Sequence, residues 1–235
     1  MAPPRATGWQ RPPQLSPAAI AGYKRAAAEA AAAMVADGMR VGLGSGSTVA
    51  YLLPALAQRE RRTLTCVATS QATERAARKL GLTVRSLDDL GELDLAIDGA
   101  DQVDPRGWLI KGGGAAHTRE KIVAAAARQF VVIVSAEKAV AALGPSVPLE
   151  LLRFGVRSTL AAVGNARLRE GAGVSPDGGL IADYWGPVGD PRRLAARLSA
   201  IPGVVEHGLF APEMVSLILI AGEAGVERRA GGGER

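Results

Sequence analysis

The hydrophobic positions of this 235-residue chain fall into short continuous runs, separated by alanine-rich and polar segments. Continuous apolar runs of about four to eight residues are typical of strands that are buried on both faces of a parallel sheet. The runs predict strands at residues 40–43, 64–68, 93–97 and 130–135. The intervening segments predict helices at residues 17–37, 47–59, 71–80 and 119–128. Gly38 is expected to stop the first helix, and Pro54 to kink or shorten the second.

The alternation of strands and helices predicts an α/β fold with a parallel sheet, whose ligands bind at the carboxyl ends of the strands. The regular alternation of strands and helices ends after Leu143, where Pro145 and Pro148 interrupt the pattern. Shorter elements follow: a helix near 157–169, a strand at 179–184 and a helix at 191–200. A last apolar run, at 214–221, predicts a strand that returns to the main sheet. The predicted division is a disordered leader (1–16), a main domain (17–143 and 212–226), an inserted small α+β domain (144–211) and a disordered tail (227–235).

Three carboxylates, Asp98, Asp101 and Asp104, come directly after the apolar run 93–97. Carboxylates at the carboxyl end of a strand suit proton transfer, and they also suit a magnesium ion. A nearby lysine and the lack of a nucleotide motif argue against magnesium. A capped turn with a solvated acid is the simpler alternative for Asp98 and Asp104.

A glycine loop with one lysine follows these carboxylates. Lys111 precedes three glycines at 112–114, and Glu120 falls near the start of the next predicted helix. Successive glycines expose backbone amides that can hold an anion, so acid, cation and amides together suit proton transfer on an anionic substrate. Taken alone, Glu120 fits a surface position in a first helical turn, where the helix dipole favours an acid. His117 is interpreted as a polar loop residue.

A second glycine-rich turn, at residues 42–48, joins the first predicted strand to the next helix. Free amides, the helix dipole and the hydroxyls of Ser45, Ser47 and Thr48 favour an anion such as phosphate. The turn does not match the dinucleotide-binding or P-loop motifs. A tight turn with a serine cap is the alternative interpretation.

Lysines are few and lie close to these motifs. Only five of the 28 lysine and arginine residues are lysines, and four of them, Lys24, Lys111, Lys121 and Lys138, fall in or near the candidate segments. A compact ammonium group is not interchangeable with a planar guanidinium in a tight site. The net charge of +5 does not indicate a nucleic-acid partner, because no basic run with interleaved aromatic residues occurs.

The remaining composition argues against several kinds of site. The single cysteine, Cys66, excludes an intramolecular disulfide, fits a reducing cytoplasm and is expected to be a small buried strand residue. With two histidines and no second cysteine, a zinc site is not expected. No apolar run reaches the roughly 18 residues that span a bilayer, and the leader lacks the apolar segment of a secretory signal.

In their order along the chain, these motifs resemble the ribose-5-phosphate isomerase family, type A. The resemblance runs from about residue 17 to 226, and its strongest segments are 42–48, 98–104, 110–122, 135–138 and 201–210. It implies a Rossmann-like domain with an inserted small α+β (ferredoxin-like) domain, in a homodimer or homotetramer. It also implies an aldose-ketose isomerase of the pentose phosphate pathway, which interconverts D-ribose 5-phosphate and D-ribulose 5-phosphate through an enediolate without a metal or cofactor.

The resemblance also implies residue roles. Glu120 would be the base that moves a proton between C2 and C1, while Lys111 and the glycine-loop amides would stabilise the enediolate oxygen. Asp98 and Asp101 would hold sugar hydroxyls and help to open the ring. The implied substrate-binding residues are Lys24, Ser45, Gly46, Ser47, Thr48, Asp98, Gly99, Ala100, Asp101, Lys111, Gly112, Gly113, Gly114 and Lys138.

Two positions depart from the family pattern: Gln102 replaces a usual acid, and Ser45 replaces a common threonine. Two other functions stay open. A related sugar-phosphate enzyme, such as an amino-sugar phosphate deaminase, is disfavoured by the scarcity of histidine. A non-catalytic sugar-phosphate sensor is disfavoured because Glu120 and Lys111 are both present and the length leaves no room for a DNA-binding module.

Overall fold

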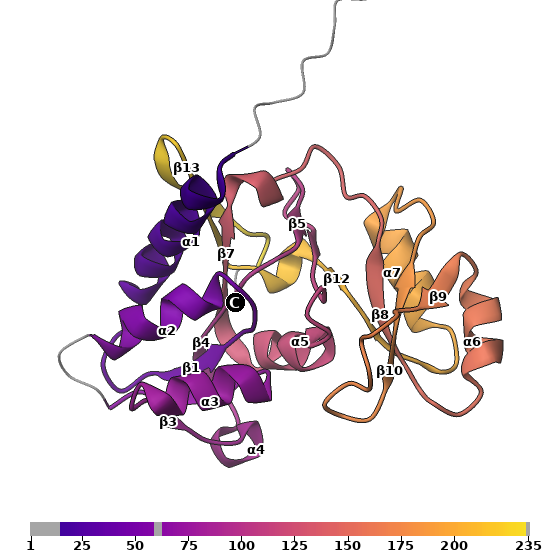
Figure 1. The fold of residues 1–235 in the computed structure, drawn as a ribbon, viewed down its shortest axis with the longest axis horizontal. Coiled ribbons are helices and arrows are strands. Elements are labelled where there is room, and N and C mark those ends of the chain that lie inside the picture. The colour runs from indigo at the N-terminus through magenta and orange to yellow at the C-terminus, as the bar shows by residue number, and fades with distance from the viewer. Residues whose placement is uncertain (1–14, 59–62, 234–235) are drawn as a thin grey trace, which may run out of the picture.

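The computed structural model describes residues 15–58 and 63–233, and its larger part is built on a seven-stranded sheet (Figure 1). The strand order is β14-β13-β7-β4-β1-β2-β3. All neighbouring strands are parallel except β14, which pairs antiparallel with β13. The strands are β1 (Arg40–Leu43), β2 (Thr65–Ala68), β3 (Thr83–Val84), β4 (Leu93–Asp98), β7 (Ala127–Ser135), β13 (Leu217–Gly222) and β14 (Gly225–Ala230).

Helices cover both faces of this sheet: α1 (Pro17–Ala32), α2 (Val49–Ala57), α3 (Gln71–Lys79), α4 (Leu87–Leu90) and α5 (His117–Ala125). Side chains of β7 alternate between two hydrophobic clusters, because successive residues of a strand point to opposite faces. Val131 and Ile133 pack with α1 and α2, whereas Val132 and Val134 pack in the cluster that includes α5. Helix α1 buries alanines, whose small side chains let it lie close to the sheet.

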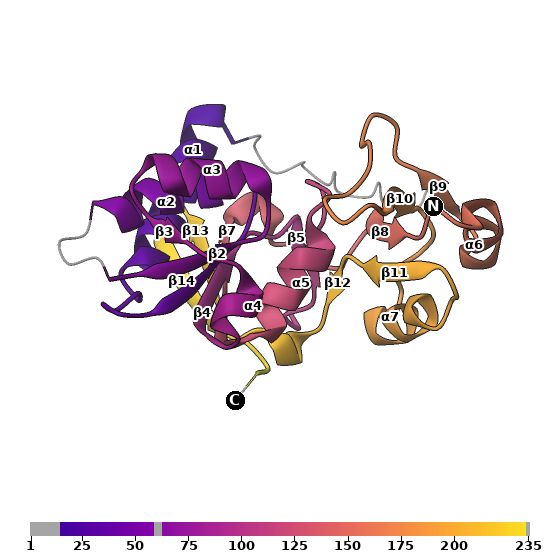
Figure 2. The ribbon, with the colours of Figure 1, turned by 90° about the horizontal axis from the view of Figure 1, so that it is seen from below.

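A smaller domain lies beside α5, as Figures 1 and 2 both show. Its elements are β8 (Val147–Leu151), α6 (Val156–Val163), β9 (Ala166–Leu168), β10 (Leu180–Tyr184), α7 (Pro191–Ser199) and β11 (Val204–His207). The strands form an antiparallel sheet of order β11-β8-β10-β9. This βαββαβ arrangement is the ferredoxin-like one, and it has a hydrophobic cluster that includes Leu149, Leu151 and Leu198.

A third, three-stranded sheet connects the two parts. It consists of β5 (Gln102–Val103), β6 (Leu109–Ile110) and β12 (Leu209–Phe210), in the antiparallel order β12-β6-β5. Short 3-10 helices, η1 (Ala136–Lys138) and η2 (Pro212–Met214), stand where the chain leaves and re-enters the main domain. The pairing of β12 with β6 brings the end of the inserted segment beside the segment that precedes Lys111.

The α/β class, the parallel sheet and the inserted ferredoxin-like fold are confirmed, as is the return of the last apolar run as β13. Cys66 is buried in β2, as predicted. The helix predicted near 157–169 is wrong beyond Val163, because Gly164 and Asn165 both adopt positive φ angles and residues 166–168 form β9. The first helix ends at Ala32, before the predicted stop at Gly38.

The two predicted disordered ends have different outcomes. Residues 1–14 of the predicted leader lie outside the described residues, and the side chain of Ser16 caps α1 by accepting a hydrogen bond from Ala19 N. The predicted disordered tail is wrong for residues 227–230, which complete β14 against β13. In the part of the chain that the structure describes, no helix is long and apolar enough to cross a bilayer.

Candidate active site

Asp98 ends β4 and points back over the turn that follows β1. Its Oδ1 accepts hydrogen bonds from the amides of Ser45 (3.1 Å) and Gly99 (2.7 Å). A Cβ at residue 44 would lie 1.9 Å from this carboxylate, so only the glycine at 44 lets the backbone pass so closely. Asp98 is therefore fixed by the carboxyl ends of two neighbouring strands, which is where ligands of parallel sheets bind.

Lys111 occupies the centre of the site and is only 3% exposed. Its backbone amide donates to Gly208 O (2.8 Å) beside β12, which directs the side chain inward. The ammonium Nζ donates to Gly99 O (2.6 Å) and lies 2.9 Å from Asp98 Oδ2 and 3.0 Å from Glu120 Oε2. The two carboxylates thus share one buried cation.

Glu120 lies in the first turn of α5 and is 6% exposed, which excludes the surface position considered above. Its only described cation within ion-pair distance is Lys111, through Oε2. Helix α5 holds it there because Val123 and Ala124, on the same helix, pack into the cluster beneath the main sheet. Its burial, together with the surrounding charges, therefore decides its protonation.

Burial raises the pKa of Glu120 to about 7, the nearby charge of Asp98 adds to this shift, and Lys111 opposes it. Burial likewise raises the pKa of Asp98, against the opposing charge of Lys111 and two amide donors. For Lys111, burial lowers the pKa, but the two carboxylates outweigh it and the net shift is upward. The lysine therefore stays charged, and Glu120 exchanges protons near neutral pH.

The glycine loop after Lys111 forms one wall of the site. Gly113 N donates to Asp101 Oδ2 (2.8 Å), and a Cβ at residue 113 would lie 2.9 Å from the other oxygen of that carboxylate. Gly112 has a φ of +109°, which side chains rarely allow, and a Cβ there would meet His117 and Pro148. The glycines at 112 and 113 are therefore required by this close packing, whereas Gly114 has open space around it.

The other wall is formed by the turn between β1 and α2. Lys24 Nζ, from α1, donates to Ser47 Oγ (2.9 Å). Ser45 Oγ lies 2.8 Å from Thr69 Oγ1. Gly46 has a φ of +105° and, like Ser47, is exposed. This wall offers hydroxyls, a cation and backbone amides at the N-terminal end of α2, a combination that suits a phosphate group.

Both walls enclose a cavity of about 120 Å³. Its lining is Ser45, Gly46, Ser47, Thr48, Gly99, Ala100, Asp101, Lys111, Gly112, Gly113, Gly114, Glu120 and Lys138. The structure thus brings together the predicted site residues from four separate segments. Asp98 lies beneath the cavity, paired to Lys111, and Lys24 contacts its Ser47 edge.

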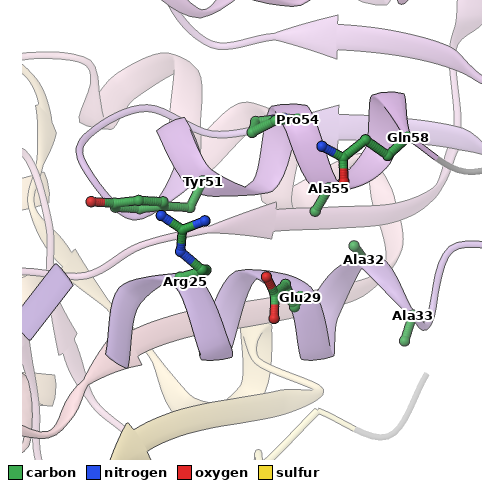
Figure 3. Close-up of a pocket in the computed structure, with 8 residues that line it drawn as sticks. All are labelled: Arg25, Glu29, Ala32, Ala33, Tyr51, Pro54, Ala55 and Gln58. Carbon is green, nitrogen blue, oxygen red and sulfur yellow. The ribbon is translucent and has the colours of Figure 1, made fainter. Parts of the chain in front are cut away.

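A larger hollow of about 280 Å³ lies between α1 and α2, away from this cavity (Figure 3). The guanidinium of Arg25 lies 5.4 Å from the centre of the Tyr51 ring, and Glu29 lies one turn further along α1. Alanine side chains, Pro54 and Gln58 supply the rest of its lining. It holds no buried charge of the kind that surrounds Lys111, so we assign the chemistry to the smaller cavity.

Several neighbouring polar residues have structural partners instead of facing the cavity. Asp104 accepts from the amides of Arg106 and Trp108 (both 2.9 Å), which confirms the capped turn considered for it, but its carboxylate is buried, so the expected solvated acid is wrong. The Gln102 side chain accepts from Gly144 N (2.8 Å), so this departure from the family pattern closes a loop. His117 is fully buried in α5, so its interpretation as a polar loop residue is wrong.

The magnesium alternative receives no support from this arrangement. Lys111 fills the space between Asp98 and Glu120, and Asp104 is engaged with its own turn. Within residues 15–58 and 63–233, no three histidine, cysteine, aspartate or glutamate side chains are grouped as metal ligands.

Two supports of the site were missed by sequence reasoning. Thr73 Oγ1 donates to Gly44 O (3.0 Å) and so braces the first glycine turn from α3. Arg169, from the inserted domain, donates to the carbonyls of Gly112 (2.9 Å) and Gly113 (3.0 Å). Neither residue belongs to a motif, and each reaches its partner only through the tertiary fold, so no local pattern could have identified them.

Comparison with known proteins identifies the family of this chain. The family model for ribose 5-phosphate isomerase A (phosphoriboisomerase A) matches residues 65–225. Ribose-5-phosphate isomerase A of Methylorubrum extorquens is 48% identical over 218 residues, which cover 85% of this chain and 92% of the relative.

Two solved structures are similar over nearly the whole chain. Ribose 5-phosphate isomerase A of Methanocaldococcus jannaschii has a TM-score of 0.84 and 33% identity, covering 89% of this chain and 98% of that one. A D-ribose-5-phosphate isomerase in complex with phospho-erythronic acid has a TM-score of 0.85 and 32% identity, covering 90% and 99%. The chain belongs to the ribose 5-phosphate isomerase A family.

Proposed function

We propose that this chain is an aldose-ketose isomerase that interconverts D-ribose 5-phosphate and D-ribulose 5-phosphate through an enediolate, in the non-oxidative branch of the pentose phosphate pathway. Membership of the family supports the reaction. The observation that carries the proposal is the buried Lys111 ammonium on the cavity wall, 3.0 Å from Glu120. A base and a fixed cation side by side are what enolisation of a carbonyl compound requires.

In the proposed mechanism Glu120 is the base. Its carboxylate removes the proton from C2 of the open-chain aldose, and the electron pair moves into a C1–C2 double bond as the carbonyl oxygen becomes negative. Glu120 then returns the proton to C1, while the C2 hydroxyl proton is transferred to O1, and the ketose results. A pKa of about 7 suits both halves of this shuttle, because the group can accept and return a proton near neutral pH.

Lys111 and the amides of the glycine loop would stabilise the negative oxygen of the enediolate. Lys111 is held by Asp98 and the Gly99 carbonyl, so it need not reorganise as charge develops on the substrate. Asp101, whose carboxylate also receives Gly113 N, would bind sugar hydroxyls and help to open the ring together with Asp98. Each role rests on a group whose position is fixed before substrate binds.

The phosphate would occupy the opposite wall, at Ser45, Gly46, Ser47 and Thr48, with Lys24 and Lys138 as its cations. A relative of this chain has been solved in complex with phospho-erythronic acid. That ligand is a hydroxylated carboxylic acid with a phosphate, so it presents an oxyanion and a phosphate to one site. A cavity with the buried Lys111 and the more exposed hydroxyl turn fits such a pair of anionic groups.

A coupled assay of the purified protein on ribose 5-phosphate, with a chelator present, tests the proposal. We expect turnover that is the same with and without chelator. The Lys111→Met variant, prepared in parallel, controls for contaminating isomerase from the expression host. Absence of wild-type turnover would refute the proposed reaction, and turnover that disappears only on chelation would restore the metal alternative.

We also propose the setting in which the enzyme works. Residues 17–143 and 212–230, the latter extended to include all of β14, would form the catalytic domain and 144–211 the smaller one, in a cytoplasmic homodimer or homotetramer. The single buried cysteine supports a reducing compartment. Light scattering during gel filtration measures the mass of the assembly, and a monomer would contradict the proposed association.

A further inference from the structure

Arg169 is the residue of the inserted domain that holds the glycine loop of the cavity. It follows β9, and one guanidinium nitrogen, Nη1, donates both to Gly112 O (2.9 Å) and to Gly113 O (3.0 Å). These two carbonyls belong to the loop that lines the cavity beside Lys111. A cation of the second domain is therefore bonded directly to the backbone of the candidate site.

The guanidinium is itself held firmly. Its Nε and Nη2 donate to the two carboxylate oxygens of Asp183 in β10, at 2.8 and 2.6 Å, and the backbone amide of Arg169 donates to Ile181 O (2.9 Å). Ser146 Oγ donates to the same carboxylate (3.2 Å). A bidentate pair of this kind fixes orientation as well as charge, so the two loop carbonyls meet a rigid donor.

The planarity of the peptide unit carries this constraint to the cavity. In a trans peptide the C=O and N–H groups point in opposite directions. The peptide between Gly112 and Gly113 forms a hydrogen bond on each side: its carbonyl accepts from Arg169, and its amide donates to Asp101. Among the described residues, the next peptide is held at its carbonyl alone, again by Arg169, so its Gly114 amide points away from the Arg169 guanidinium.

The Gly114 amide is left available to a ligand. It donates to no other residue in the described ranges, and Gly114 lines the cavity together with Lys111 and Glu120. We propose that Arg169 is a positioning residue that aims the Gly114 amide at the enediolate oxygen, so that the inserted domain completes the oxyanion site. This inference rests on the proposed isomerase function.

The test is Arg169→Met, which keeps an aliphatic stem and removes every donor. We expect kcat on ribose 5-phosphate to fall about 10- to 100-fold with a smaller change in KM. A misaligned Gly114 amide would stabilise the transition state less, while binding of the substrate would change little. Inhibition by phospho-erythronic acid, whose carboxylate resembles the enediolate, should weaken by a similar factor. Inhibition by inorganic phosphate should stay within about twofold, because the phosphate wall is unchanged.

The pair of inhibitors separates positioning from folding. A variant that only loses folded protein has a lower apparent kcat but unchanged inhibition constants for both compounds, and that result would overturn the proposal. Arg169→Lys keeps the charge but cannot hold Asp183 and two carbonyls at once, so it should lose nearly as much as Arg169→Met. Wild-type kinetics in either variant would also overturn it.

Arg197→Met is the matched control. Arg197 also belongs to the inserted domain and also donates to a backbone carbonyl, that of Val163 (3.0 Å), but Val163, unlike Gly112 and Gly113, does not line the cavity. Its kinetic constants should equal those of the wild type. If the wild type turns over substrate and the Arg169 variants have the same kinetic constants, this inference alone is refuted. If the wild type shows no turnover, the proposed function on which the inference rests is refuted.

Discussion

The two walls of the cavity hold their charges in different ways. On one side, Asp98, Lys111 and Glu120 are almost fully buried, and the Lys111 ammonium lies 2.9 Å from Asp98 and 3.0 Å from Glu120. On the other wall, Ser47 is exposed and Lys24 reaches it from a separate helix. The charged side chains of the first wall are therefore shielded from water, whereas the second wall is open to it.

Because of this difference, we expect the buried wall to determine the rate of the chemical step and the open wall to determine the affinity for the substrate. Electrostatic interactions are stronger where water is excluded, so the buried wall can shift a pKa and stabilise a developing charge. Solvent and salt screen charges on the open wall, which can still hold a phosphate by several donors. Changes in the buried wall should therefore act on kcat, and changes in the open wall on KM.

Glu120→Gln should give the largest effect, because it keeps the shape of the side chain but removes the base. General-base catalysis contributes about 10²- to 10⁴-fold, so we expect a loss of kcat in that range with little change in KM. Steady-state kinetics on ribose 5-phosphate measure it. The control is Glu29→Gln, at an exposed glutamate of α1. If Glu120→Gln keeps more than about a third of the wild-type kcat, the base is another group.

Substitution of Lys111 should cause the second-largest loss of kcat. Loss of one oxyanion donor costs about 10²- to 10³-fold in kcat, and we expect this for Lys111→Met. Lys111→Arg should lose nearly as much, because a guanidinium is larger and spreads its charge. Both variants are measured at low and high ionic strength. A near-normal kcat for Lys111→Arg, with a salt-sensitive kcat/KM, would mean that the lysine only attracts the substrate from a distance.

The pH dependence tests the burial of Glu120 directly. Since its pKa is raised from 4.5 to about 7, kcat/KM should fall as the pH decreases through about 7. The folded state binds this proton more tightly than the unfolded state does. The contribution of Glu120 to stability is therefore complete below pH 4.5 and is lost as the pH rises through about 7.

Glu120→Gln should remove this pH-dependent loss of stability. The difference in Tm between variant and wild type should thus favour the variant more at pH 8 than at pH 4.5, which thermal unfolding at the two pH values measures. A Tm difference that is the same at both pH values, or a kcat/KM that is flat from pH 5 to 8, would contradict the raised pKa.

Lys24→Ala and Lys138→Ala should give the smallest effects, and mainly on KM. A hydrogen bond to a charged group contributes about 1.5–3 kcal/mol, and exposure to salt reduces this, so we expect a rise in KM of about tenfold or less. Inorganic phosphate should compete with substrate and do so less well in both variants. Lys79→Ala, at an exposed lysine of α3, is the control. Undiminished competition by phosphate would move the phosphate site elsewhere.

Much of the main sheet could be predicted from the sequence, because its strands are continuous apolar runs. β1 matches its predicted limits, and β4 and β13 were located to within a few residues. Strand β14 was missed because Glu227, Arg228 and Arg229 resemble a charged tail. Strand β8 was missed because Pro148, which is an edge or turn signal, sits inside it.

The candidate site was predictable only where its residues belong to motifs. Lys111, the glycines after it and Glu120 are close in sequence, and their types indicate proton-transfer chemistry. Arg169 stands 57 residues from Gly112, in a chain rich in arginine, and nothing in its neighbourhood distinguishes it. Its contact depends on how the inserted domain folds against α5, which sequence patterns do not specify.

The placement of the glycine loop has a consequence for the order in which the enzyme becomes active during its synthesis. Every residue proposed to touch the substrate lies between Lys24 and Lys138. The groups that hold the Lys111 segment, Gly208 O and Arg169, are translated later. A nascent chain with 143 residues outside the ribosome would thus possess the complete set of reactive side chains without the backbone contacts that align them. The reactive residues are therefore synthesised first, and the site becomes active only when the last third of the chain has folded against it.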